Sequence, residues 1–299
     1  MTHLTSAHDT HSRETSTPLQ IALNTLTSDL DVVNRVANDP IHFPKSFKNA
    51  LDQEIVALFA ALLAYGRVSA IGQAIQSVLD VLSDSPSDDI IQDAQLRRKQ
   101  HSPPSRFQGF VYRFTRESDL QKLWVGVGEV ILRYGSIGQC FRAHLQPEDS
   151  TLINAYQGFY HDVLTYSEAL SGGQGFNHFF SDPSKGSALK RINMWLRWMV
   201  RGPDEIDLGI WNDLGPQRLL IPLDVHVFRL SQAIGLTKRR SANLKTAIEI
   251  TEALKHFDPQ DPIKYDFALA HLGISGACKG YKVLNICTNC PLESLCTLK

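Results

Sequence analysis

The hydrophobic positions along this chain recur with a helical period wherever they are regular. Over residues 51–82, 189–199 and 244–254, apolar side chains return at steps of three and four residues. This spacing keeps them on one face of a helix. Alternation of apolar and polar residues, which is typical of strands, nowhere extends convincingly beyond four residues. The sequence therefore predicts an all-α protein.

Clusters of turn-forming residues separate the predicted helices. They fall at 83–89, 101–106, 171–175, 181–186 and 202–215. These are loop-sized breaks, so we expect one helical core in two lobes over residues 18–276. Residues 1–17 are rich in Ser, Thr and His with little to bury, which predicts a disordered tail. Residues 277–299 form a separate cysteine-rich loop in this interpretation.

Charge and apolar run length exclude several classes of protein. The 299 residues carry 30 Lys and Arg against 31 Asp and Glu, so any affinity for nucleic acid must come from a local patch. The longest apolar run, Ile55–Tyr65, has 11 residues, whereas a membrane-spanning helix needs roughly 18 or more. The N-terminus has no basic stretch followed by an apolar core, so a secretory signal is not predicted. A cytoplasmic location is expected.

Four of the five cysteines lie in the last 22 residues. Cys278, Cys287, Cys290 and Cys296 follow the pattern C-x8-C-x2-C-x5-C. Four thiolates at such spacing complete either a tetrahedral zinc site or an iron–sulfur cluster, and the spacing leaves both open. Cys140 stands apart and is predicted to be a buried thiol.

Two segments carry candidate chemistry. In the predicted helix after Gly186, the side chains of Leu189, Ile192, Leu196 and Met199 point inward, and Lys190, Arg197 and Arg201 share another face. Downstream, Asp224 follows Pro222 and is a good N-cap for a helix. Between residues 181 and 240 there are ten Lys and Arg against six Asp and Glu. This local excess suits phosphate contact, with His226, Lys238, Arg239 and Arg240 as further candidates, although surface solubility is an alternative for the last three. A solvated basic face would explain Lys190, Arg197 and Arg201 equally well.

Three segments resemble known DNA repair enzymes. The cysteine tail is similar to the iron–sulfur loop of endonuclease III and the related adenine glycosylases. The string DVHVFR, residues 224–229, resembles a segment of endonuclease III, and Lys190 follows Gly186 as the nucleophilic lysine of bifunctional members follows the first glycine of their hairpin. The chain is thus similar to the helix-hairpin-helix DNA glycosylase superfamily. The strings KRINMWLRWMVR, PLDVH and DPIKYDFALAHLG also resemble an uncharacterised bacterial family related to it.

The resemblance implies a DNA glycosylase with AP-lyase activity, acting on double-stranded DNA with a damaged base or abasic site. Lys190 would be the nucleophile, with Lys185 as the fallback, and Asp224 the catalytic carboxylate. A 4Fe-4S cluster on the four cysteines is the implied cofactor, with zinc as the alternative. The implied DNA contacts come from hairpin, helix and wedge positions. They are Gly186, Ser187, Arg191, Arg197, Arg201, His226 and Arg67.

Other interpretations stay open at this point. The protein could bind nucleic acid on the same scaffold without chemistry, or could be a redox-responsive or structural metal protein. Arg67, at the end of a segment similar to the superfamily's first long helix over 51–71, could be a wedge or an ordinary surface residue. The aromatic string at residues 107–114 is either a core-capping loop or a platform for stacked bases.

Overall fold

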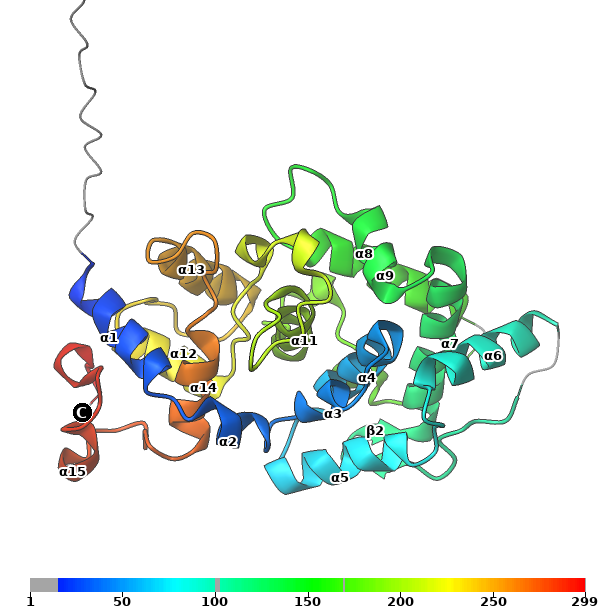
Figure 1. Cartoon of the computed structure of the whole chain (residues 1–299), viewed down its shortest axis with the longest axis horizontal. Coiled ribbons are helices and arrows are strands. Elements are labelled where there is room, and N and C mark those ends of the chain that lie inside the picture. Colours follow the sequence, from blue (N-terminus) through cyan, green and yellow to red (C-terminus); the bar gives the residue numbers. More distant parts are fainter. Residues whose placement is uncertain (1–15, 100–102, 169, 299) are drawn as a thin grey trace, which may run out of the picture.

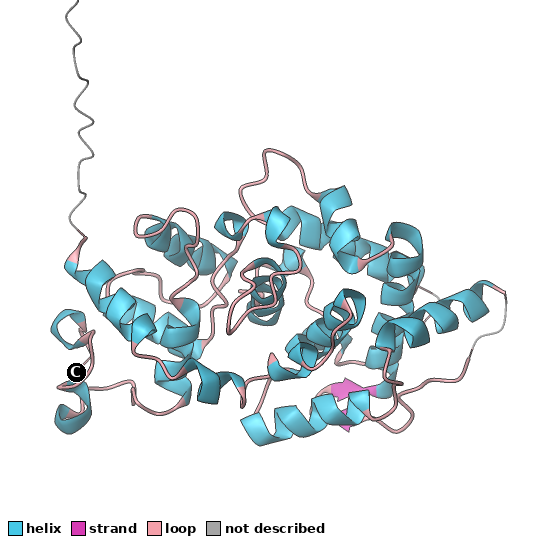
Figure 2. Ribbon diagram, in the orientation of Figure 1, coloured by secondary structure: helices cyan, strands magenta, loops and turns pink. Residues whose placement is uncertain are grey.

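The computed structural model describes residues 16–99, 103–168 and 170–298. Within these ranges the protein is all-α, as predicted: α-helices account for nearly all regular structure, and the strands β1 (Val111–Tyr112) and β2 (Thr115–Arg116) form one short hairpin (Figure 2). Residues 1–15 of the predicted tail lie outside the described residues. Thr17 is structured, because its side chain caps the first helix by accepting a hydrogen bond from the Gln20 amide.

The α-helices of the described ranges follow one another along the chain with mostly short connections. In order they are α1 (Pro18–Ser28), α2 (Val32–Val36), α3 (His42–Lys45), α4 (Ala50–Leu63), α5 (Val68–Leu79), α6 (Pro86–Arg98), α7 (Glu117–Tyr134), α8 (Ile137–His144), α9 (Ile153–Tyr166), α10 (Phe176–Phe179), α11 (Lys190–Val200), α12 (Val225–Ala233), α13 (Leu244–Lys255), α14 (Asp266–Ile274) and α15 (Leu284–Cys287). Four 3-10 segments lie between them: η1 (Pro183–Lys185), η2 (Asn212–Leu214), η3 (Pro216–Arg218) and, after α15, η4 (Glu293–Leu295).

The helices gather into two groups with α11 near the centre (Figure 1). On one side α6, α7, α8 and α9 pack against one another, and α4 contacts α6, α8 and α11. On the other side α14 packs on both α12 and α1. The first helix thus joins the helices of the C-terminal part. Gln20 Nε2 donates to the Phe257 carbonyl at 2.9 Å, and Tyr265 donates to Asn24 at 3.0 Å.

Helix α4 is the centre of the hydrophobic core. Its residues from Ile55 to Leu63 are all buried. The carboxylates of Asp52 and Glu54 near its start are buried as well, and each accepts hydrogen bonds from neighbouring elements. Glu54 accepts hydrogen bonds from the Trp211 indole at 2.6 Å and the Ile137 amide at 2.9 Å, while Asp52 accepts from the Ser87 amide at 2.7 Å. Because buried carboxylates are costly without partners, these contacts fix α6 and α8 against α4.

The segment 51–71 is two helices rather than the single long helix that the resemblance implied. Helix α4 ends at Leu63 and α5 begins at Val68. Gly66 between them has φ of +111°, a conformation that interrupts a helix and that side-chain-bearing residues rarely adopt. No helix within the described ranges is long and apolar enough to cross a lipid bilayer.

Candidate functional site

Lys190 is the first residue of α11, the helix near the centre of the molecule (Figure 1). The chain enters this helix through η1 and two left-handed residues, Gly186 at φ +70° and Leu189 at φ +50°. Leu189 is buried, so its side chain anchors this strained turn. The Lys190 side chain is half-buried, with Nζ 3.1 Å from Met194 Sδ. The amine is therefore held against the helix start.

Asp224 caps α12, as the sequence predicted. Its Oδ1 accepts hydrogen bonds from the amides of His226 at 2.8 Å and Val227 at 2.9 Å. Both capping bonds use the same oxygen, which leaves Oδ2 outside the cap. The residue is half-buried. A carboxylate in this state combines a structural role with an oxygen that is available to a ligand.

A third residue, Asp266 at the start of α14, is a buried carboxyl near these two elements. The pKa of Asp266 is raised to about 6, and burial is the largest cause. The Asp224 carboxylate also raises this pKa, whereas the Arg197 guanidinium and the Lys190 side chain lower it. Both Lys190 and Asp224 are thus close enough to Asp266 for their charges to act on it. Arg197 of α11, the helix that Lys190 begins, pairs with Asp266 at 2.7 Å, and α14 packs on α12, the helix that Asp224 caps. Asp266, which the sequence analysis did not single out, thus connects the two elements that carry the predicted residues.

Arg197 and Arg201 do not form the exposed basic face that the sequence analysis expected. The Arg197 side chain is only 2% exposed and pairs with Asp266 at 2.7 Å and Asp207 at 3.2 Å. Arg201 is 17% exposed and pairs with three carboxylates, including Asp207 at 2.8 Å and Asp261 at 2.9 Å. Because α11 is surrounded by other helices, its polar positions need internal partners. The prediction that these two arginines contact DNA is wrong.

Arg191 is also engaged internally. Its guanidinium donates to the carbonyls of Leu62 and His178 and lies over the Tyr65 ring, 5.0 Å from the centroid. Burial lowers the pKa of Arg191 to about 10. The residue links α4, α10 and α11, so we correct its predicted role from a DNA contact to a structural one.

The hairpin before α11 is exposed and paired with a second loop. Lys185, Gly186 and Ser187 are all exposed, and a Cβ at Gly186 would meet nothing within 4 Å. Ser187 forms a β-bridge with Asn243, the N-cap of α13, and the Leu244 amide donates to the Gly186 carbonyl at 3.1 Å. In the sequence, the exposed Lys and Arg residues nearest to the paired segments at Gly186–Ser187 and Asn243–Leu244 are Lys185, Arg240 and Lys245. Backbone and cations together make a surface that suits phosphate groups.

Comparison with known proteins gives a family and no activity. The model of the family described as "Protein of unknown function (DUF2400)" matches residues 39–275. This chain belongs to the DUF2400 family. No curated protein and no solved structure matches it. In this DUF2400 protein the matched range includes Lys190, Asp224 and Asp266 and stops before Cys278.

The four C-terminal cysteines of the DUF2400 protein line one pocket. They do so with Leu230, Leu272 and Leu292. Burial raises the pKa of Cys290, and negative charge on each of the other three cysteines raises it further, so all four sulfurs face a common region. The loop is tied to α14 by the Cys278 amide, which donates to Leu272 at 2.8 Å, and to α12 by Thr297, which donates to Ala233 at 2.9 Å. The donor set and the pocket fit a thiolate-bound metal group.

An exposed aromatic group lies at the end of α4. Phe114, at the tip of the β1–β2 hairpin, is 59% exposed. Arg113 beside it has φ of +51°, and its guanidinium carbon lies about 6 Å from the rings of both Tyr65 and Phe114. His178 makes edge contacts with the same two rings. Within the predicted aromatic string, Phe107 and Tyr112 cap the core, and Phe114 remains available for stacking.

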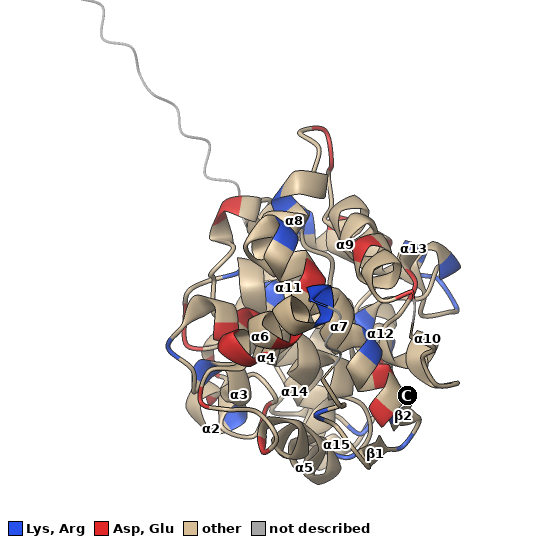
Figure 3. Cartoon of the chain, turned by 90° about the vertical axis from the view of Figure 1, so that its right-hand side faces the viewer, with Lys and Arg blue, Asp and Glu red and all other residues tan. Residues whose placement is uncertain are grey.

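Two further predicted contacts differ in accessibility. Arg67 is exposed, directly after Gly66 at the break between α4 and α5. His226 is half-buried in the first turn of α12, where it packs closely on Gly273 of α14. Only Arg67 of these two is free of close packing. From one side of the molecule, Lys and Arg are interspersed with Asp and Glu (Figure 3).

Proposed function

We propose that this DUF2400 protein is a DNA glycosylase with AP-lyase activity, on a two-lobed fold like that of the helix-hairpin-helix superfamily its sequence resembles. The observation that carries the proposal is that Asp266 connects the two helices whose starts carry Lys190 and Asp224: it pairs with Arg197 of α11 at 2.7 Å, and its own helix α14 packs on α12. An amine and a carboxylate from separate helix starts are what base excision with strand cleavage requires.

The chemistry follows from the two side chains. The Lys190 amine attacks C1′ of the flipped nucleotide as the glycosidic bond breaks and the base departs with the bonding electrons. Asp224 stabilises the positive charge that develops on the sugar. The proton lost from the nitrogen passes to the departing base, and opening of the sugar ring with protonation of O4′ by water gives a protonated Schiff base. Loss of a C2′ proton to solvent with β-elimination of the 3′ phosphate then cleaves the strand. Asp266, paired with Arg197 at 2.7 Å, is a positioning residue in this proposal.

DNA would be held by two surfaces. The hairpin at Gly186 and Ser187, with Lys185 and the exposed Arg240 and Lys245 near the start of α13, offers backbone amides and cations to phosphates. Phe114 and Arg67 would fill the space left by the flipped nucleotide, because a base expelled from the duplex leaves its neighbours unstacked. Net charge is −1, so this local surface must supply the electrostatic attraction.

We further propose that the four cysteines hold a 4Fe-4S cluster. The four thiols line one pocket, and the resemblance of this segment to the iron–sulfur loop of endonuclease III favours a cluster over a single zinc ion. When bound, the cluster would supply a cross-link between α12 and α14, the helices that carry Asp224 and Asp266.

Borohydride trapping tests the activity. Reduction of the full-length protein with DNA containing an abasic site is expected to give a covalent complex, and Lys190→Ala to abolish it. Lys48→Ala, at an exposed position before α4, is the control and should retain the complex, while Lys185→Ala tests the fallback nucleophile. The proposal fails if wild-type protein binds this DNA without crosslinking, which would instead support a non-catalytic nucleic-acid-binding protein. Loss of the complex only in Lys185→Ala would move the nucleophile to Lys185.

A further inference from the structure

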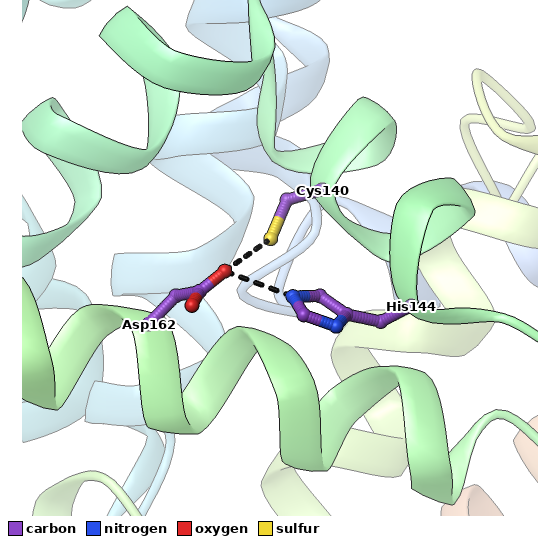
Figure 4. A group of neighbouring side chains, drawn as sticks. All are labelled: Cys140, His144 and Asp162. Atoms are coloured by element: carbon purple, nitrogen blue, oxygen red, sulfur yellow. Dashed lines mark hydrogen bonds and ion pairs between the residues drawn. The ribbon is translucent and has the colours of Figure 1, made fainter.

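A second group of metal-binding side chains lies far along the chain from the C-terminal cysteines. Cys140 and His144 stand four residues apart on α8, so they share one face of the helix. Asp162 faces them from α9 (Figure 4). One ligand atom from each residue lies within 4.8 Å of the other two. His144 Nε2 is 2.8 Å and Cys140 Sγ is 3.7 Å from the same carboxylate oxygen, Asp162 Oδ2.

We propose that Cys140, His144 and Asp162 bind a zinc ion that pins α8 to α9. A thiolate, an imidazole and a carboxylate are the three ligand types that zinc takes from proteins. Ligands at about 2.0 to 2.3 Å from zinc stand roughly 3.3 to 3.8 Å apart in tetrahedral geometry. The three side chains need only small movements to reach that spacing. The thiol and imidazole protons on the bonding atoms leave to solvent as the ion enters.

The surroundings support a built site. Gly158 of α9 lies against the His144 ring, and a Cβ there would overlap the imidazole. Only glycine allows the ring to approach α9 at this position. The Tyr134 hydroxyl donates to Asp162 Oδ2 at 2.8 Å and orients the carboxylate, as partners of metal ligands commonly do.

Burial sets which part of the site meets solvent. Cys140 is fully buried, whereas the side chains of His144 and Asp162 are 31% and 14% exposed. Water can therefore reach the fourth position from the His144 side. Three protein ligands and one water complete a tetrahedral zinc ion. The site depends on no part of the proposed DNA chemistry.

Zinc binding to the purified full-length protein tests the proposal. His144→Ala should bind one zinc ion fewer per chain than wild type, and zinc should raise its Tm less. His161→Ala, at an exposed position of α9 next to Asp162, is the matched control and should behave as wild type. Equal zinc stoichiometry in His144→Ala and wild type would overturn the proposal and leave the three residues as a hydrogen-bonded group.

A second measurement on wild type does not depend on a variant that folds. X-ray absorption at the zinc edge should report nitrogen or oxygen ligands near 2.0 Å together with sulfur near 2.3 Å. Sulfur ligands alone would place all bound zinc at the four C-terminal cysteines and refute the site at α8 and α9.

Discussion

Replacing Arg197 with Ala tests whether this arginine is an internal support, as the structure indicates. Arg197 is the ion-pair partner of Asp266, at 2.7 Å, whereas Asp207 also pairs with Arg201. Removal of the Arg197 guanidinium therefore leaves the buried Asp266 carboxylate without a countercharge, whereas Asp207 is still paired with Arg201. Breaking a buried ion pair in this way costs about 3 to 5 kcal/mol. We expect the free energy of unfolding of Arg197→Ala to fall by that amount at pH 7.

The assay is urea denaturation followed by tryptophan fluorescence, with the free energy taken from the midpoint and slope. Arg239→Ala is the matched control: its pair with Glu249 is exposed, at 43% and 39% of the two side chains, so the loss should stay below about 1 kcal/mol. The double variant Arg197→Met with Asp266→Asn removes both charges and should recover most of the stability. An Arg197→Ala protein as stable as Arg239→Ala, with weakened DNA binding, would refute the reasoning.

Three further predictions concern the acidic centre, the aromatic tip and the cysteine loop. With a folded pKa of about 6 against a usual 3.8, Asp266 is protonated in the fold and charged in the unfolded chain between these values. Its contribution to the free energy of unfolding is therefore complete below about pH 4 and is lost, by about 3 kcal/mol, as pH rises through 6. Urea titrations at several pH values should show that Asp266→Asn lacks this loss of stability with rising pH. Parallel plots of unfolding free energy against pH for wild type and variant would contradict it. Phe114→Ala should weaken binding to abasic DNA by about 5- to 150-fold, as expected for one stacked base, with unchanged Tm. Val111→Ala, on the same hairpin and 65% exposed, should not weaken binding, and an equal loss in both variants would exclude stacking by Phe114. Cys290→Ser should remove the absorption at roughly 400 nm that is expected of an iron–sulfur cluster, and the control Cys140→Ser should keep it. A colourless wild-type protein that contains zinc would refute the cluster.

Local sequence patterns predicted what depends on neighbouring residues. The apolar residues of α11 at three- and four-residue steps are buried as expected, because helical period alone decides which side chains share a face. Asp224 caps α12 because its carboxylate reaches the amides two and three residues ahead. Cys140 is buried, as an isolated cysteine among apolar residues usually is.

Long-range packing decided what the sequence could not predict. The pattern in α11 separates an apolar face from a polar one, but it cannot tell that the polar face is also covered, by Asp207 and Asp266 from later segments. Asp266 was missed for the same reason, since nothing in its own segment marks a partner 69 residues away. The pair Cys140 and His144 did carry a signal, two ligand types four residues apart on one helix, but Asp162 completes the group only in the folded protein.

The packing of α1 on the C-terminal helices has a consequence for synthesis of the chain. The side chain of Gln20 finds its acceptor 237 residues later, at Phe257. At about 5 to 20 residues per second, a ribosome needs roughly 12 to 47 seconds to reach that point. Throughout that interval α1, whose Leu23 and Leu26 are buried in the finished protein, lacks the C-terminal helix α14 on which it packs, so the nascent N-terminus is a natural place for a chaperone to bind.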